Sequence, residues 1–189
     1  MRLLEDRILA DGKVCDGAVL KVGTFLNHCI DISLLREMGK EFKTLYNDCE
    51  VTKILTIEAS GIAIACVTAQ FFYCPVVFAK KSASVNLTPD VISERVHSYT
   101  HGNDYDAVVQ SGLLTPEDCV LIIDDFLANG AALNGLIGLC RTAGARIAGA
   151  GIAIEKVFQG GGNAIREKGI RVESLAKIIS MDNNKIVFG

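Results

Sequence analysis

The feature that most constrains this chain is its alternation of short apolar runs with segments of helical character. Residues 51–57 (VTKILTI), 75–79 (PVVFA) and 119–124 (CVLIID) have the length and composition of buried strands. Mostly apolar helices are predicted over 61–72 and 129–144. A strand, a helix and a second strand at this spacing form a parallel crossover unit. The sequence therefore predicts an α/β fold, a twisted and mainly parallel sheet with helices on both faces.

Flanking segments extend this pattern. Residues 31–47 place apolar side chains at three- and four-residue spacing behind Asp31, which predicts an amphipathic helix with Asp31 as its N-cap. Residues 19–27 are expected to be extended and to cap one end of the sheet. The remaining predictions are strands at 146–155, 170–179 and 185–188 and a short helix near 162–168.

Size and charge narrow the function classes. With 189 residues, half of them hydrophobic, the chain fits a single domain over 1–189. The formal charge of -3 and the pI near 5.6 give no broad positive field, so a nucleic-acid partner is not predicted. The 7 cysteines are far apart and form no CxxC pair, as expected of reduced thiols. No secretory signal or bilayer-length apolar run is present, so we expect a cytoplasmic protein without a membrane partner.

Residues 80–106 interrupt the alternation. The segment is polar, lacks a sustained period, and holds Ser82, Ser84 and Asn86. Loops of this length in a compact domain are typically lids, binding loops or disordered stretches. We therefore predict a flexible lid over about 80–106. Its two histidines are not expected to bind a metal, because exposed loop histidines are far commoner than ligands.

One stretch, 120–133 (VLIIDDFLANGAAL), points to a ligand. It carries four apolar residues into two adjacent carboxylates, Asp124 and Asp125, and then into a loop of small residues. Ligands of open parallel sheets bind beyond the carboxyl ends of the strands. The loop 128–132 runs into a helix N-terminus, where backbone N–H groups can close around a phosphate. Together these features describe a sugar-phosphate site, although a solvated strand end followed by a helix N-cap has the same composition.

The same stretch resembles the signature with which type I phosphoribosyltransferases bind phosphoribosyl pyrophosphate (PRPP). The variant IIDDFLANG, with TIEASGIA upstream and AGAGIAIEKVFQ downstream, is most similar to the members of that family that act on xanthine, and the resemblance covers essentially the whole chain. It implies the type I fold, with a small hood contributed by about 1–35 and the C-terminal strands. It also implies transfer of the ribosyl 5-phosphate of PRPP to a purine nitrogen, with Mg²⁺ held mainly through PRPP and pyrophosphate rather than by a protein site.

The resemblance also assigns residues. Asp124 and Asp125 would hold the ribose hydroxyls and favour positive charge developing on the sugar ring. The 5-phosphate would lie on Ala128, Asn129, Gly130, Ala131 and Ala132. Because Ala128 and Ala132 lack the hydroxyls found in many relatives, phosphate binding would depend on the backbone and Asn129. The pyrophosphate would meet Glu58, Ala59, Ser60, Gly61, Lys80 and Lys81.

The base would contact three further residues. Lys156 resembles the family lysine that donates to an exocyclic purine oxygen, which disfavours adenine. Leu20 and Asn27 match positions that contact xanthine, and Asn27 is the candidate partner for the C2 carbonyl that hypoxanthine lacks. The family commonly forms homodimers, so a homodimer is expected.

Two alternatives stay open at this point. One is a phosphoribosyltransferase for hypoxanthine, guanine or adenine, which base preference would distinguish. The other is a PRPP-sensing regulator on the same fold without catalysis. DNA-binding regulators of that kind usually carry a winged-helix segment and a basic surface, which this acidic chain does not display.

Overall fold

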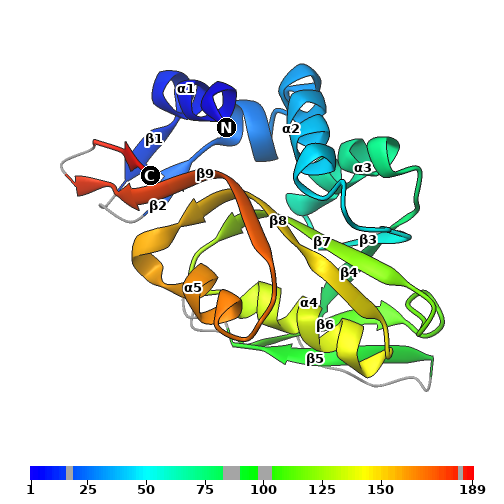
Figure 1. Cartoon of the computed structure of the whole chain (residues 1–189). Coiled ribbons are helices and arrows are strands. Elements are labelled where there is room, and N and C mark those ends of the chain that lie inside the picture. Colours follow the sequence, from blue (N-terminus) through cyan, green and yellow to red (C-terminus); the bar gives the residue numbers. More distant parts are fainter. Residues whose placement is uncertain (16–18, 83–89, 98–103, 183–184) are drawn as a thin grey trace.

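The computed structural model describes residues 1–15, 19–82, 90–97, 104–182 and 185–189. Within these residues the main sheet has eight strands in the order β10-β9-β8-β7-β3-β4-β6-β5 (Figure 1). Five neighbouring strands are parallel: β3 (Lys53–Ile57), β4 (Val76–Ser82), β7 (Cys119–Leu127), β8 (Arg146–Lys156) and β9 (Val172–Ser180). Antiparallel strands complete both edges: β5 (Val91–Val96), β6 (Tyr105–Gln110) and β10 (Val187–Phe188). The prediction of a mainly parallel sheet is confirmed.

Helices cover both faces of the sheet. The two apolar clusters divide along β7, because alternate side chains of a strand point to opposite faces. Leu121 and Ile123 pack in the cluster formed with α2 (Ile32–Leu45) and α3 (Gly61–Phe72), whereas Val120 and Ile122 pack in the cluster that includes α4 (Ala131–Thr142). The short helix α5 (Gly161–Arg166) adds Ile165 to the second cluster. The central strands are therefore buried on both faces.

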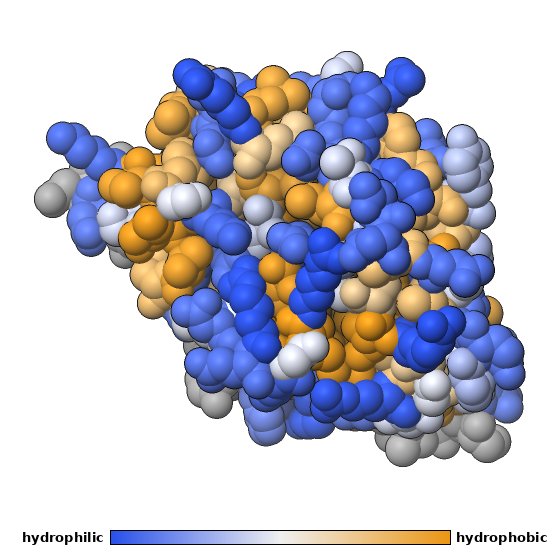
Figure 2. All heavy atoms as spheres, in the orientation of Figure 1, coloured by the Kyte–Doolittle hydropathy of each residue, from blue (hydrophilic) through white to orange (hydrophobic). Residues whose placement is uncertain are grey.

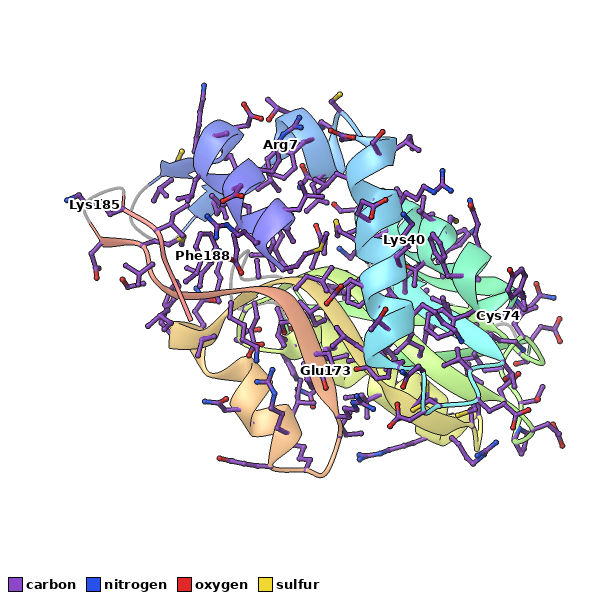
Figure 3. The ribbon with its side chains drawn as sticks, turned by 45° about the horizontal axis from the view of Figure 1, so that its top comes forward. Arg7, Lys40, Cys74, Glu173, Lys185 and Phe188 are labelled. Atoms are coloured by element: carbon purple, nitrogen blue, oxygen red, sulfur yellow. The ribbon has the colours of Figure 1, made fainter. Side chains whose placement is uncertain are left out.

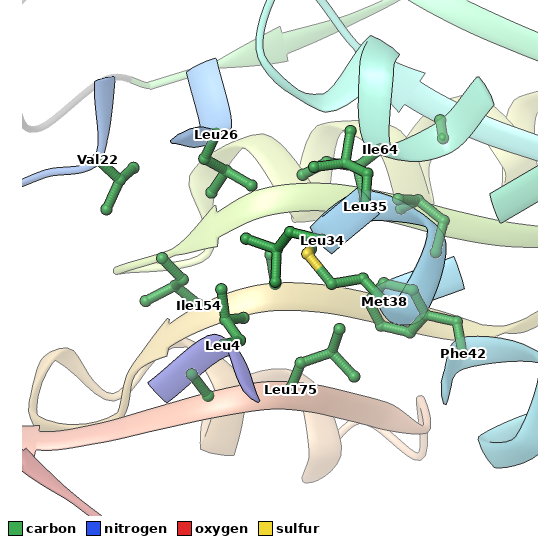
Figure 4. Close-up of a cluster of buried hydrophobic side chains, with 14 of the residues drawn as sticks. Leu4, Val22, Leu26, Leu34, Leu35, Met38, Phe42, Ile64, Ile154 and Leu175 are labelled. Carbon is green, nitrogen blue, oxygen red and sulfur yellow. The ribbon is translucent and has the colours of Figure 1, made fainter. Parts of the chain in front are cut away.

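The predicted helix behind Asp31 is confirmed as α2. The Asp31 carboxylate accepts a hydrogen bond from Leu34 N at 3.0 Å, which satisfies one of the unpaired amides of the first turn. Apolar side chains of α2, among them Leu34, Leu35, Met38 and Phe42, lie over β8 and β9 (Figure 4).

Residues from both ends of the chain form the part that we call the hood. It comprises α1 (Arg2–Asp11), the hairpin of β1 (Lys13–Cys15) and β2 (Val19–Lys21), the helical turn Gly23–Asn27, and β10. Arg7 of α1 and Phe188 of β10 both lie in this part (Figure 3), and the N-terminal amine donates to the carbonyl of Leu175 on β9. Hydrophobic side chains are visible on its surface at the upper left of Figure 2.

Three predictions made from the sequence need correction. The extended segment predicted over 19–27 ends at Lys21, and a helical turn follows at Gly23–Asn27. The strand predicted over 75–79 continues through Ser82. The long loop predicted over 80–106 contains β5, which pairs with β6 over its whole length. The apolar pattern did not reveal β5, because the residues in its middle are polar. They are tolerated in the strand because its position at the sheet edge leaves them accessible to solvent. Residues 83–89 and 98–103, with Ser84 and Asn86, lie outside the described residues.

Part of the packing between β8 and α2 depends on Gly151. A Cβ atom at this position would lie 2.7 Å from Ile123 Cδ1 and 2.8 Å from Phe42 Cδ1, both fully buried side chains. We expect Gly151→Ala to lower the free energy of unfolding by about 1–3 kcal/mol through overpacking. Urea denaturation would measure it. The double variant with Phe42→Leu should lose less than the sum of the single variants; strictly additive losses would contradict this packing.

Candidate active site

The acidic pair lies inside β7 and not beyond its end. The ladder between β3 and β7 is paired up to Leu55 and Ile122, whereas the ladder between β7 and β8 continues to Leu127 and Glu155. β7 therefore projects past its pairing with β3. Asp124 and Asp125 occupy this projecting part, at the carboxyl edge of the parallel strands where ligands of such sheets bind.

Both carboxylates are held by the backbone that follows them. Asp125 N donates to Asp124 Oδ1 at 3.0 Å, and Phe126 N donates to Asp125 Oδ1 at 2.9 Å. Asp124 is only 5% exposed. Burial and then the neighbouring charge of Asp125 raise the pKa of Asp124 well above its usual value, and burial also raises the pKa of Asp125. Two like charges in one buried place favour a ligand that brings hydroxyl donors or positive charge.

The loop after β3 meets this pair from the neighbouring strand. Its glycine, Gly61, has no room for a side chain: a Cβ there would overlap with Thr56 Oγ1 and lie 3.0 Å from Asp124 Oδ1. A hydrogen bond from Ser60 lowers the pKa of Asp125, against the larger effect of burial. The Glu58–Ala59 peptide bond is cis. The structure thus brings the predicted pyrophosphate loop, 58–61, directly against the acidic pair.

Only one of the two predicted lysines points to this place. Successive residues of a strand face opposite sides, so Lys80 and Lys81 of β4 diverge. Lys81 N donates to Glu58 Oε1 at 2.6 Å, and the positive charge of the Lys81 side chain lowers the pKa of Asp124. Lys80 instead lines an apolar groove on the other side of the strand, with Phe78 and Leu113.

The predicted phosphate loop forms a small hollow of about 150 Å³, lined by residues 126–133 together with Val96 and Tyr105. Gly130 has φ 85° and precedes the first turn of α4, where backbone N–H groups lack helical partners. Asn129 was predicted to add a side-chain donor. In the structure its Oδ1 accepts a hydrogen bond from Ala131 N at 3.0 Å, so the side chain acts as an acceptor and pairs with one of the loop amides that could otherwise bind a phosphate.

The base end of the site is predicted from Lys156, at the end of β8. Its Nζ lies 5.5 Å from the ring centroid of Phe126, and burial lowers its pKa. Two residues earlier, Ile154 packs in the same apolar cluster as Val22 and Leu26 of the hood (Figure 4). The hood therefore closes over the strand that carries Lys156.

The two hood residues predicted to contact the base lie in this region. Leu20 is buried in the apolar cluster and is 5% exposed. Asn27 is half-buried at the end of the helical turn, and its Oδ1 would lie 3.8 Å from a Cβ built on Gly23. Their contact with xanthine stays a prediction.

Three aromatic residues near the site were not predicted. Lys81 Nζ lies 5.4 Å from the ring centroid of Tyr105, whose pKa is raised by burial and by the charge of Asp124. Phe126 faces Lys156, and Phe158 is 45% exposed two residues after Lys156. The sequence did carry a signal for Phe126 and Phe158, because each lies within two residues of a predicted site residue. Tyr105 had none, since β6 was not predicted.

Among the described residues, no group of three or more histidine, cysteine and acidic side chains could hold a metal ion. The site offers hard carboxylate oxygens, which suit Mg²⁺, but too few for a complete shell. These residues fit an ion that arrives on substrate phosphates. In the same residues, no helix has the length and apolar character needed to cross a bilayer.

Comparison with known proteins decides the family. No model of a protein family matches the chain. Xanthine phosphoribosyltransferase of Lachnoclostridium phytofermentans is 56% identical over 190 residues, covering 100% of this chain and 98% of the relative. The enzyme of that name from Ruminiclostridium cellulolyticum is 52% identical, with coverage of 100% and 99%. The chain belongs to the xanthine phosphoribosyltransferase family.

Solved structures support the fold expected of a xanthine phosphoribosyltransferase. Adenine phosphoribosyltransferase of Giardia lamblia, complexed with 9-deazaadenine, superposes with a TM-score of 0.77 at 24% identity, over 92% of this chain and 97% of that one. The Trypanosoma brucei adenine phosphoribosyltransferase, in complex with AMP, pyrophosphate and ribose-5-phosphate, gives a TM-score of 0.75 at 16% identity, over 92% and 79%. At these identities the likeness shows the fold, and it confirms the type I fold predicted from the sequence.

The burial of Asp124 yields a prediction about stability and pH. Its pKa in the folded protein is raised above the usual 3.8, so at pH 7 the buried charge destabilises the ligand-free fold. As the pH falls through the raised pKa toward 3.8, the carboxyl group protonates in the folded state and the penalty disappears. We expect Asp124→Asn to raise the Tm at pH 7 and this gain to shrink on acidification.

Differential scanning calorimetry between pH 4 and pH 8 would measure the effect. Asp6→Asn on the exposed side of α1 is the control and should leave the Tm nearly unchanged, because exposed ion pairs contribute little. A Tm of Asp124→Asn below that of the parent protein at pH 7 would contradict the inference that the buried charge of Asp124 destabilises the fold.

Proposed function

We propose that this protein catalyses the Mg²⁺-dependent transfer of the 5-phosphoribosyl group from PRPP to xanthine, giving XMP and pyrophosphate, in purine salvage. The observation that carries the proposal is the acidic pair of β7, with Asp124 buried and Asp125 half-buried, which lies against the loop after β3 and directly precedes the loop after β7. Relatives named for this activity cover the full chain. The free state of all seven cysteines, including the buried Cys119 and Cys140, supports a cytoplasmic location.

Each part of the site has a role in this reaction. The sugar develops positive charge at its anomeric carbon as pyrophosphate departs, and Asp124 and Asp125 favour that charge while they hold the ribose hydroxyls. Amides of the loop 128–132 bind the 5-phosphate, and amides of the loop 58–61 with Lys81 bind the pyrophosphate. Catalysis is then mainly positioning and electrostatics. Mg²⁺ bound to PRPP would neutralise part of the charge on the leaving group.

Base selection rests on Lys156. Its ammonium donates to an exocyclic purine oxygen. Adenine carries an amino group at that position, so two hydrogen-bond donors would face each other and adenine would bind less well. Phe126 beside it and the exposed Phe158 can supply apolar ring surface for a flat base. Leu20 and Asn27 would complete the base pocket from the hood.

The first test is pyrophosphate release with PRPP and Mg²⁺, run in parallel with xanthine, guanine, hypoxanthine, adenine and no base. The proposal expects the fastest release with xanthine. Faster pyrophosphate release with another base would support phosphoribosyl transfer as the reaction but reject xanthine as the substrate. PRPP binding without release for any base would favour a PRPP-sensing regulator.

Lys156→Met should lower kcat/KM for xanthine more than it lowers the affinity for PRPP. Methionine keeps the length of the side chain but removes the donor, and a buried oxygen left without its partner costs about 1–3 kcal/mol, roughly 5- to 150-fold. Steady-state kinetics with the oxo-purines and adenine would measure the change. Lys40→Met, on the outer side of α2 (Figure 3), is the matched control and should leave the kinetics unchanged. Unaltered discrimination between xanthine and adenine in Lys156→Met would reject the role.

We further propose that the protein acts as a homodimer that uses the groove lined by Lys80. This groove, of about 500 Å³, lies between β4, β6 and the segment around Leu113, and Phe78 and Leu113 are 41% and 44% exposed in it. An apolar groove beside a cationic side chain suits a second copy of the chain. Phe78→Glu should therefore shift the protein toward the monomer in sedimentation velocity. Tyr73→Glu, at a 95% exposed aromatic outside the groove, should not. Equal sedimentation of Phe78→Glu and the parent protein would reject this interface.

A further inference from the structure

Three consecutive glycines lie at the start of α5, and the roles proposed above use none of them: Gly160 is the N-cap, and Gly161 and Gly162 are the first two residues of the helix. Each answers a different steric demand. Gly160 has φ 77°, a backbone conformation that other residues rarely adopt, and open space around its Cα. Gly161 and Gly162 are buried and have no room for a side chain. The start of α5 is thus packed backbone to backbone against its surroundings.

Gly161 contacts the phosphate loop. A Cβ there would overlap with Ala128 O, Asn129 C and Gly130 N, and Gly161 N donates to Ala128 O at 3.1 Å. Ile165, one turn later, lies 3.1 Å from where a Cβ of Gly130 would be. The N-terminal turn of α5 therefore packs directly against the loop, and its position constrains the position of the loop amides.

On its other side, Gly162 contacts the ion pair between the buried Glu155 and the half-buried Arg166. A Cβ there would overlap with Glu155 Oε1 and lie 2.7 Å from Arg166 Nη1. Arg166 binds Glu155 through both nitrogens, at 2.8 and 2.7 Å, and Ser174 Oγ donates to the same carboxylate at 2.5 Å. Arg166 also donates to the carbonyl of Val172. α5 is therefore clamped between Glu155 and the phosphate loop.

Glu155 connects the clamp to the rest of the site. Its side chain is 2% exposed, and its backbone pairs with Leu127, the residue that precedes the phosphate loop. It also directly precedes Lys156 in the chain. Burial would raise the pKa of Glu155, but the hydrogen bonds from Arg166 and Ser174 outweigh burial and hold the pKa below its usual value. The carboxylate thus keeps its charge and its partner at neutral pH.

We propose that Glu155 and Arg166 are positioning residues. Through the glycine turn of α5, they hold the phosphate loop in the position in which its backbone amides bind the 5-phosphate of PRPP. The inference rests on the proposed function only for the identity of the ligand. It extends the PRPP site to residues that never touch PRPP.

If the ion pair had a purely structural role, its loss would lower the stability of the fold without a specific effect on PRPP binding. Breaking a buried pair by removing one partner destabilises a fold wherever the pair lies. The chain offers an arginine of similar exposure for comparison, since the side chain of Arg171 is 36% exposed and that of Arg166 is 30% exposed. Arg171 binds Asp48 through Nη1 at 2.9 and 3.0 Å and Glu173 at 3.0 Å, and none of its hydrogen bonds, ion pairs and ring contacts with described residues reaches the phosphate loop or α5. Loss of stability alone should be common to both arginines.

The experiment compares Arg166→Gln, Arg166→Lys and Gly161→Ala with Arg171→Gln. Titration calorimetry gives the Kd for PRPP with Mg²⁺, steady-state kinetics give KM for PRPP and for xanthine, and urea denaturation gives stability. We expect Arg166→Gln and Gly161→Ala to weaken PRPP binding by about 10- to 100-fold, as for a displacement near 1 Å at a binding group. KM for xanthine should change less. Arg166→Lys should recover part of the loss, because it restores the charge without the fork.

Arg171→Gln should lower stability and leave the Kd for PRPP unchanged. The inference is overturned if Arg166→Gln is folded and binds PRPP like the parent protein, whatever its loss of stability relative to Arg171→Gln. If Gly161→Ala does not fold, the two Arg166 variants still decide. A parent protein that binds PRPP but releases no pyrophosphate with any base would reject the proposed function, while the Kd comparison would still test the clamp.

Discussion

The close placement of two adjacent carboxylates, one buried and one half-buried, in the projecting end of β7 is the constraint on which the site depends. An ionised carboxylate that leaves water without a counter-charge is costly, and Asp124 is almost fully buried next to another aspartate. The surrounding structure meets this cost only in part, through one backbone N–H for each carboxylate, the hydrogen bond from Ser60 to Asp125 and the charge of Lys81. The ligand-free protein therefore has negative charge at this site that is only partly compensated. A polyhydroxylated sugar with developing positive charge would compensate it further.

Glycines determine how closely the other parts approach this pair. Gly61 brings the first turn of α3 against Asp124, Gly161 brings α5 against the phosphate loop, and Gly151 brings β8 against α2. In each case a single methyl group would overlap with buried atoms, so the spacing of the site is set by backbone contact and not by adjustable side chains. Such contacts fix the loop amides in place before the ligand binds, which is the requirement for electrostatic catalysis.

Much of the fold could be predicted because the central parallel strands β3, β7 and β8 are buried on both faces, and such strands appear in the sequence as continuous apolar runs. β4 was found from its apolar run as well, although one of its faces carries the exposed Phe78. The edge strand β5 was missed, since its middle residues, Ser93, Glu94 and Arg95, are polar and break the apolar run on which the other strands were recognised. The ends of β4 and β7 were placed too early for the same reason: a charged residue such as Lys81 or Asp125 continues a strand when the neighbouring backbone provides hydrogen-bond partners.

The sequence by itself determined the fold class and the chemistry of the site. Apolar runs, the acidic pair and the small-residue loop are local patterns, and each depends on properties that residues carry wherever they lie. Only the tertiary structure decided which side chains meet. Strand alternation separated Lys80 from Lys81, the antiparallel β6 brought Tyr105 to the phosphate loop, and the fold placed the phosphate loop and Glu155 on either side of α5. These relations join residues far apart in the chain, and their geometry is set by packing, which no local pattern encodes.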